Sequence, residues 1–367
     1  MSAPRLEIHL DRIHHNARVL VERLRARGID VTGVTKATLG SPEIARELIG
    51  AGVGSIGESR IENIEAMHLA GLSPPMTLIR APMPSQAERV VAHADVSLNT
   101  ELDTIDRLSV AATAQHRPHR VLLMVELGDL REGIMPGDLG SVALRASRLP
   151  HIVVCGIGTN LACQSGVAPD RHNMAELSAL ATSLEATLGA PMQIVSGGNS
   201  ANLDWALGGA DVGRINNLRL GESILLGREP LRRRPIDGLC TDAITLIGEV
   251  IESKSKPTRP RGRIEQSAFG EPSGTGPDAR GAGRTDRTRT DRTRTIVALG
   301  RQDADPAGLG APAGWEILGA SSDHLVLDAG SAVPAIGSEV RFQPDYSALL
   351  RAMTSPFVSR VFVRDDT

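Results

Sequence analysis

The chain has 367 residues, which is enough to bury a large core and to form two domains. Its net charge of −3 and aromatic content of 2% argue against a nucleic-acid surface, which needs basic patches or stacking platforms. The three cysteines lack metal-ligand spacing, which argues against a metal site. No apolar run is long enough for a leader or a membrane span. We expect a cytoplasmic protein with no metal site and no nucleic-acid or membrane partner.

The first predicted element is a helix, because apolar residues recur at helical spacing between residues 10 and 27. Strand-like runs then alternate with helical ones as far as residue 221. We predict eight strands, at Val31–Ala37, Ser55–Glu58, Met76–Arg80, Val96–Asn99, Val121–Leu127, Ile152–Thr159, Gln193–Ser196 and Ile215–Leu220. The helices predicted between them are Pro42–Ala51, Arg60–Ala70, Gln86–Ala92, Glu101–Ala114, Gly140–Ser147, Ala175–Leu188 and Ala201–Leu207.

Eight strands that alternate with helices predict an α/β protein with a (β/α)8 TIM barrel. A doubly wound sheet is the alternative. It is the weaker one, because no Gly-x-Gly-x-x-Gly sequence follows the first strand.

The pattern changes after residue 228, where short strands follow one another without long helices. We predict them at Ala243–Glu252, Thr295–Leu299, Trp315–Leu318, His324–Leu327 and Glu339–Phe342. The expected domains are therefore a barrel at 1–235 and a small, mainly-β domain at 236–367. A Pro/Gly/Arg-rich insert near 272–294 ends in a repeat of Arg, Thr and Asp without apolar residues, so we expect disorder there. A basic arm for nucleic acid is the alternative, although Asp286 and Asp291 dilute its charge.

Lys36 is the first candidate for chemistry. Only three of the 40 basic residues are lysines, and the other two, Lys254 and Lys256, lie far along the chain. An arginine keeps its proton and cannot form an imine, whereas a lysine amine can. Lys36 lies near the carboxyl end of the first predicted barrel strand, where barrels carry their active sites. The plainer interpretation is a lysine that merely ends a strand.

Two loops near the end of the predicted barrel are suited to bind an anion. Gly197 and Gly198 allow backbone amides to approach a ligand, and Ser200 adds a hydroxyl at a helix start. On the next strand, Arg219 and Gly221 are two residues apart and face the same side. Barrels frequently bind phosphate at the loops after strands 7 and 8, so the pattern predicts a phosphate site close to Lys36. An ordinary strand-to-helix turn is the alternative for the first loop.

With these residues identified, the chain resembles the alanine racemase fold family of pyridoxal phosphate (PLP) enzymes, over nearly its whole length. Val34–Lys36 is similar to that family's cofactor lysine motif, Asn199-Ser200 to its phosphate-binding pair, and Leu218–Gly221 to the strand with the arginine that faces the pyridine nitrogen. The alanine/ornithine racemase branch is indicated by Gly57–Asn63, Leu127–Gly133 and Gly156–Asn160.

The resemblance implies a PLP-dependent racemase that interconverts L- and D-amino acids of the ornithine, lysine or alanine type. Lys36 would hold PLP as an aldimine, exchange it for the substrate amine and then take or return the α-proton. Arg219 would face the pyridine nitrogen. Ser200, with the backbone N–H groups of Gly221 and Glu222, would bind the phosphate.

The resemblance implies further roles with weaker sequence matches. Arg131 would orient the cofactor's phenolic oxygen and the substrate carboxylate; the alternative is an ion pair at the barrel rim with Glu126, Asp129 or Glu132. Asn160 stands where the family places a histidine over the ring. Asp323, with the backbone of Ser322, would position the substrate carboxylate across a homodimer whose active site is shared between subunits. Another phosphate ligand of the family falls near Thr354 or Ser355.

The chain departs from the family pattern at two tyrosines. The second base of alanine racemases is replaced by Arg301, which cannot act as a base, and the only tyrosine, Tyr346, matches a packing position. Asp303, His324 and Cys163 remain candidates, as does Lys36 acting on both faces through a water. The tyrosine that usually follows the cofactor lysine is also absent, since Ala37–Gly40 stands there.

Two other functions remain open. A PLP-dependent decarboxylase shares the two-domain plan, but such enzymes usually pair the pyridine nitrogen with a carboxylate, against which Arg219 counts. A non-catalytic PLP-homeostasis protein shares the Gly-Glu-x-Arg sequence near Gly57 but lacks a β domain. The sequence alone does not select the amino acid, because too many acidic residues could accept a far ammonium.

Overall fold

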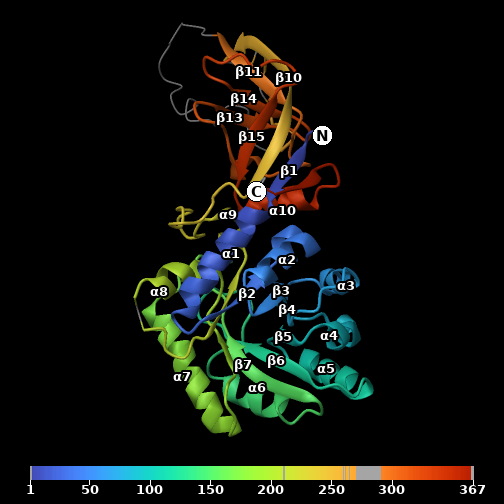
Figure 1. The fold of residues 1–367 in the computed structure, drawn as a ribbon, viewed down its shortest axis with the longest axis vertical. Coiled ribbons are helices and arrows are strands. Elements are labelled where there is room, and N and C mark those ends of the chain that lie inside the picture. Colours follow the sequence, from blue (N-terminus) through green and yellow to red (C-terminus); the bar gives the residue numbers. More distant parts are fainter. Residues whose placement is uncertain are drawn as a thin grey trace. The chain divides into compact units, whose positions relative to one another are not determined.

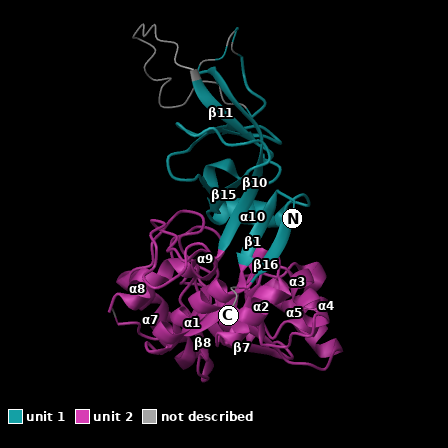
Figure 2. Ribbon diagram, turned by 45° about the horizontal axis from the view of Figure 1, so that its top comes forward, with its two compact units in different colours: residues 1–8, 244–363 teal, residues 9–243, 364–367 magenta. Residues whose placement is uncertain are grey.

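A computed structural model describes residues 2–209, 211–258, 260, 262–263, 265–269 and 291–364. The chain divides into two compact units, one of residues 1–8 with 244–363 and one of residues 9–243 with 364–367 (Figure 2). Each unit has its own sheet, so each is described by itself.

The unit of residues 9–243 is a closed barrel of eight parallel strands with helices between them (Figure 1), which confirms the predicted fold. The strands are β2 (Asp30–Val34), β3 (Ser55–Glu58), β4 (Met76–Leu78), β5 (Val96–Asn99), β6 (His119–Met124), β7 (Ile152–Gly158), β8 (Ile194–Ser196) and β9 (Asn217–Leu220). The helices are α1 (Leu10–Arg25), α2 (Pro42–Gly50), α3 (Ile61–Leu69), α4 (Ala87–His93), α5 (Leu102–Ala114), α6 (Leu139–Ala146), α7 (Arg171–Leu188), α8 (Leu203–Leu207) and α9 (Glu222–Leu226).

Local chemistry explains where several helices begin and end. Helix α2 starts where the hydroxyl of Ser41 accepts the N–H of Ile44 and a proline occupies the first turn. Helix α7 starts at a capping box between Asp170 and Asn173, and ends at Gly189, whose φ of 66° favours glycine.

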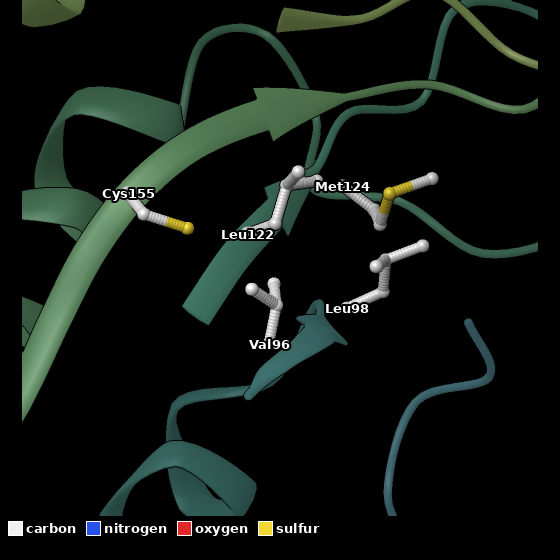
Figure 3. Close-up of a cluster of buried hydrophobic side chains, with 5 residues drawn as sticks. All are labelled: Val96, Leu98, Leu122, Met124 and Cys155. Carbon is white, nitrogen blue, oxygen red and sulfur yellow. The ribbon is translucent and has the colours of Figure 1, made fainter. Parts of the chain in front are cut away.

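The interior of the barrel includes an apolar cluster on three neighbouring strands (Figure 3). Its members are Val96, Leu98, Leu122, Met124 and Cys155, all at most 5% exposed. This burial is expected of parallel strands that helices cover on the outside. His119 is also buried, 2.8 Å from the hydroxyl of Ser97, and burial lowers its pKa to about 4. The imidazole is therefore neutral at physiological pH.

The other unit is an antiparallel sheet, which confirms the predicted β domain in class. Its strands are β1 (Arg5–His9), β10 (Ile244–Pro257), β11 (Asp291–Val297), β12 (Leu309–Gly310), β13 (Glu316–Ala320), β14 (Leu325–Asp328), β15 (Glu339–Pro344) and β16 (Ser359–Val363). The main strand order is β12-β15-β10-β11-β14-β13, with β1 paired to β10 and β16. One helix, α10 (Tyr346–Thr354), follows β15.

The boundary of this unit differs from the expected division at 235/236. Residues 1–8 belong to the sheet rather than to the barrel, because β1 pairs with β10 from Arg5↔Ile247 to Ile8↔Ile244. Leu6 and Ile8 are fully buried there, and Arg5 pairs with Glu7 and Glu339. Sequence patterns miss this arrangement, since the partners of β1 lie more than 200 residues away.

The expected insert also needs a partial correction. Residues 291–294 open β11, where Arg292 pairs with Lys256 and Arg294 with Lys254 in register. Alternating Thr and Arg suits a strand with one covered face, and Thr295 is fully buried. The remainder of the predicted insert, residues 272–290, lies outside the described residues.

A glycine in the barrel wall provides a test of this packing. A Cβ at Gly156 in β7 would overlap the backbone carbonyl of Ile194 in β8, so Gly156→Ala must push two paired strands apart. We expect a loss of more than about 2 kcal/mol in the free energy of unfolding, measured by urea denaturation followed by circular dichroism.

Gly140→Ala is the matched control. A Cβ at this position in α6 meets no heavy atom within 4 Å, so its stability should be unchanged or raised by up to about 1 kcal/mol. Equal stabilities for the two variants would contradict the described packing of β7 against β8.

Candidate active site

Lys36 follows β2 at the edge of the barrel that carries the carboxyl ends of the strands. The strand predicted to reach residue 37 ends at Val34, and residues Lys36–Thr38 form a 3₁₀ turn, η1. Thr35, the residue before this turn, is fully buried, and its hydroxyl donates to the Glu58 carboxylate at 3.0 Å. This hydrogen bond helps to hold the start of the turn in place. Lys36 therefore lies in the turn directly after the first barrel strand and follows a residue that is hydrogen-bonded to Glu58 in β3.

Arg219 on β9 is the buried cation of the site. Its side chain donates to the Ser196 hydroxyl at 2.5 Å and to the carbonyl of Thr159 at 2.7 Å. Strand β9 pairs with β2, so the strand of Arg219 neighbours the strand that Lys36 follows. Burial lowers the pKa of Arg219 to about 10, which still leaves the guanidinium protonated at neutral pH.

Two asparagines lie beside this arginine. The Asn160 amide oxygen accepts from Arg219 at 3.4 Å and from the Asn199 amide at 3.1 Å. Asn199 also donates to the carbonyl of Leu161. The amide nitrogen of Asn160 is buried and has no hydrogen-bond partner among the described residues. A buried donor of this kind is costly unless a ligand atom satisfies it.

The residues predicted to bind phosphate come together at the starts of two short helices. The Ser200 hydroxyl lies 3.0 Å from the Ser223 hydroxyl and accepts the N–H of Ser223. Gly221 stands where β9 meets β2, and a Cβ there would lie 3.1 Å from the carbonyl oxygen of Val34. A side chain at this position would therefore be tightly packed against β2.

Glu222 is the first residue of α9, and its side chain interacts electrostatically with Lys36. Burial raises the pKa of this carboxyl to about 7, although Arg233 and Lys36 oppose the shift. Close to neutral pH the carboxyl is therefore roughly half protonated.

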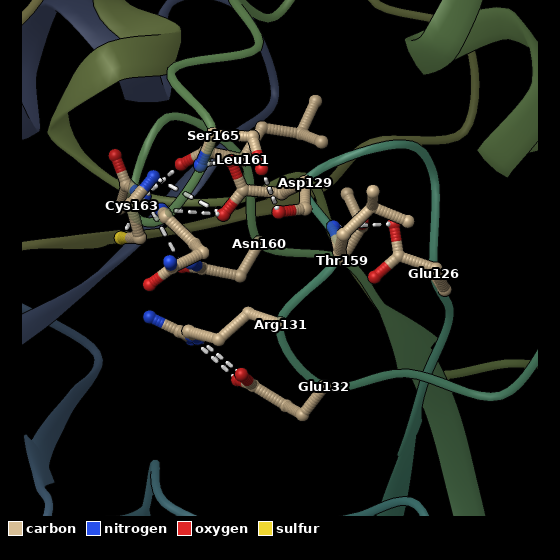
Figure 4. Close-up of polar contacts among 12 residues, drawn as sticks. Glu126, Asp129, Arg131, Glu132, Thr159, Asn160, Leu161, Cys163 and Ser165 are labelled. Atoms are coloured by element: carbon tan, nitrogen blue, oxygen red, sulfur yellow. Dashed lines mark hydrogen bonds and ion pairs between the residues drawn. The ribbon is translucent and has the colours of Figure 1, made fainter.

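Arg131 lies on the loop after β6, where its guanidinium forms a two-bond ion pair with Glu132 (Figure 4). This pairing holds the pKa of Arg131 above its usual value. The Glu132 charge raises the pKa of Arg219 and the Arg131 charge lowers it. The ion pair is therefore close enough to influence the buried arginine.

Hydrogen bonds to Asp129 connect the Arg131 loop to a second loop, which includes Cys163–Ser165 (Figure 4). The Asp129 carboxylate accepts the backbone N–H groups of Cys163, Gln164 and Ser165. Burial would raise the pKa of this carboxyl, but the three hydrogen bonds hold it below its usual range. The exposed Cys163 is thereby placed 3.6 Å from the Asn199 amide nitrogen.

Sequence reasoning missed Asp129, Glu58 and Ser223 as the side chains that hold the site together. Their only sequence signal is proximity to predicted site residues, since each acts through a partner 23 or more positions away. Such pairings become visible only when the strand neighbours are known.

The other predicted residues lie in the sheet unit. Asp323 accepts from Gln302 and Ser322, and Asp303 is buried and accepts the N–H of Gly300. The ring of His324 lies 3.5 Å from the Ser321 hydroxyl.

Three more predicted positions in the sheet unit have local contacts. Arg301, at the position of the family's tyrosine, stacks 4.6 Å over the ring of Phe269. Thr354 donates to the last turn of α10, and Ser355 accepts the N–H of Phe357. The roles expected of all these residues stay predictions.

Comparisons with known proteins agree with this geometry. Residues 8–229 match the family model described as alanine racemase, N-terminal domain. The chain is 40% identical to a lysine racemase of Thermotoga maritima and 35% identical to an ornithine racemase of Acetoanaerobium sticklandii. These matches cover 99% and 97% of this chain and 99% of each relative.

The solved structures include an alanine racemase of Streptomyces lavendulae, 20% identical with a TM-score of 0.72, which covers 99% of this chain and 98% of that one. An alanine racemase of Streptomyces coelicolor is also 20% identical, with a TM-score of 0.74 over 98% and 97% of the two chains. These likenesses support the fold alone.

The chain therefore belongs to the alanine racemase family, as the sequence resemblance predicted. It is an amino-acid racemase. No helix in the described part of the chain is long and apolar enough to cross a membrane, and no group of His, Cys, Asp or Glu side chains within the described ranges is arranged to hold a metal.

The raised pKa of Glu222 predicts a pH-dependent stability. The folded-state pKa of about 7 exceeds the ordinary 4.5, so the protonated carboxyl favours folding below pH 4.5 and this contribution disappears as the pH rises through 7. The free energy of unfolding of the wild type minus that of Glu222→Gln should therefore fall by up to about 3 kcal/mol between pH 4.5 and 8.

Urea unfolding of both proteins at several pH values, without added ligand, would measure this difference. A difference that stays constant across the range would contradict the buried position of the Glu222 carboxyl.

Proposed function

We propose that this racemase uses PLP held by Lys36 and interconverts the enantiomers of lysine or ornithine. The observation that carries the proposal is the pairing of β2 with β9, because the turn of Lys36 follows β2, Arg219 lies on β9 and α9 starts directly after β9. The choice of substrate is supported by the two relatives named for lysine and ornithine, which match over nearly the whole chain.

The side chains of the site fit a PLP molecule. The buried amide nitrogen of Asn160 needs an acceptor, and a heteroaromatic cofactor with a phenolic oxygen and a phosphate supplies acceptors. When bound, PLP supplies an electron-accepting ring that stabilises negative charge at the substrate's α-carbon. Lys36 would hold the cofactor covalently, yield to the substrate amine, and then take and return the α-proton at Nζ.

Arg219 would set the electronic character of the ring. With a pKa of about 10 its guanidinium keeps its proton at neutral pH, so it would donate a hydrogen bond to the ring nitrogen without protonating it. An unprotonated ring is a weaker electron sink, which favours prompt return of the proton and suits racemisation over decarboxylation or amino transfer.

The phosphate would be bound by the Ser200 hydroxyl and the backbone N–H groups of Gly221 and Glu222. Gly221 is the N-cap of α9 and Glu222 its first residue, and N–H groups at a helix start lack intrahelical partners, which favours an anion. Protonation of the Glu222 carboxyl near pH 7 reduces its repulsion of the phosphate. Asn199 would fix the loop that carries Ser200, because its carboxamide accepts the N–H of Ala201.

A shared active site would complete the arrangement. We propose a cytoplasmic homodimer in which Asp323 and the backbone of Ser322 position the substrate carboxylate across subunits. Arg131 would bind the same carboxylate and the phenolic oxygen. The second proton carrier remains one of Asp303, His324 and Cys163, or Lys36 acting through a water. Of the three, Cys163 shares the barrel unit with Lys36.

The two alternative functions have less support. A decarboxylase would need a carboxylate where Arg219 stands. A carrier without catalysis would lack the sheet unit, which here has eight strands among the described residues.

Covalent labelling at Lys36 tests the proposal directly. The wild type mixed with PLP and reduced with borohydride should carry one pyridoxyl label on Lys36, located by peptide mass spectrometry. Lys36→Ala should lose the label and at least about 10³-fold of its racemase rate on L-lysine and L-ornithine, measured by chiral chromatography.

Lys254→Ala is the matched control, because this lysine lies on β10 and pairs with Glu252. It should keep both the label and the rate. A label elsewhere, or full activity of Lys36→Ala, would refute the assignment.

A further inference from the structure

The sequence alone could not select a residue that recognises the far ammonium of a diamino acid, but the contacts of the barrel's acidic residues narrow the choice. Several carboxylates at the carboxyl ends of the strands already serve the backbone. Glu58 accepts the N–H of Ser59, Glu126 accepts the N–H groups of Gly128 and Leu130, and Asp129 accepts three N–H groups of the neighbouring loop. These three fix the shape of the site.

Glu222 is also unsuited to bind an ammonium of the substrate. Its side chain is largely buried beside Lys36, and its backbone belongs to the proposed phosphate cradle. A carboxyl group that is only half ionised near neutral pH is a weak partner for a cation.

Glu132 differs from all of these. Its two carboxylate oxygens accept from the guanidinium of Arg131 rather than from backbone groups, and its side chain is 31% exposed. Its charge also acts on the buried Arg219, which places it within range of the proposed cofactor site. Glu132 is therefore a carboxylate whose partner is Arg131. Arg131 is also the residue that would bind the substrate's α-carboxylate.

We propose that Glu132 binds the side-chain ammonium of the substrate, and that the Arg131–Glu132 ion pair opens when a diamino acid arrives. This inference rests on the proposed function, in which Arg131 binds the substrate's α-carboxylate. A lysine or ornithine molecule offers a carboxylate to Arg131 and an ammonium to Glu132, so both charges exchange one partner for another.

A substrate without the second amine cannot complete this exchange. Norleucine or alanine would bring a carboxylate to Arg131 but leave the partly buried Glu132 carboxylate without a cation. A polar group of the site that is left unpaired makes discrimination against such analogues much stronger than an apolar pocket could achieve.

The test compares kcat/KM for racemisation of L-lysine and L-norleucine, which differ by the terminal ammonium, in the PLP-loaded protein. Glu132→Gln should reduce the preference for lysine over norleucine by about 10- to 100-fold. Part of the change is a higher KM for lysine, and part is a higher kcat/KM for norleucine, because norleucine no longer leaves an unpaired carboxylate. Glu132→Asp keeps the charge with a shorter reach and should retain part of the preference.

Asp138→Asn is the matched control. It removes one negative charge six positions along the same segment, from an exposed side chain, and should leave the preference unchanged. Thermal melts of all the variants would verify that they fold.

Two results would overturn the inference while leaving the racemase assignment intact. If Glu132→Gln slowed lysine and norleucine equally, Glu132 would only hold Arg131 in position. If the lysine preference survived unchanged, the ammonium would be read by another residue. A wild type that racemises alanine but neither lysine nor ornithine would refute the proposed substrate class itself, and this inference with it.

Discussion

The pairing of β2 with β9 is the constraint on which the candidate site depends. It closes the barrel, and it does so in a register that sets Thr32 opposite Arg219 and Gly33 opposite Leu220. The two strands end side by side, so the turn that carries Lys36 and the helix that starts at Glu222 share one edge. The junction is tightly packed, since a Cβ at Gly221 would lie 3.1 Å from the carbonyl oxygen of Val34.

Burial then divides the ionisable groups of this edge into different roles. Arg219 is sufficiently buried for its pKa to fall to about 10, but three acceptors keep the guanidinium oriented and charged. Burial also shifts the pKa of the Glu222 carboxyl, but upward, which favours its neutral form. Burial therefore leaves Arg219 charged at neutral pH while it reduces the charge of Glu222.

Much of this architecture could be predicted from sequence, because the barrel is built from local alternation. The strands β3 and β5 have the predicted bounds, and the Ser200 hydroxyl contacts Ser223 in α9, the helix that follows Arg219 and Gly221. The pairing of β1 with β10 could not be predicted, since Arg5 to Ile8 carry no signal for a partner so far along the chain. The first barrel strand, β2, was also predicted to be too long. Thr35 has a high β-propensity, but its hydroxyl donates to Glu58 where the chain leaves the strand.

The identity of the ammonium acceptor is the clearest case of information that only contacts contain. Glu58, Glu126 and Asp129 each accept backbone N–H groups, whereas Glu132 accepts from the guanidinium of Arg131, and nothing in the sequence marks this difference. A diamino acid carries one ammonium more than alanine does, and under the proposal Glu132 is the anion that pairs with it.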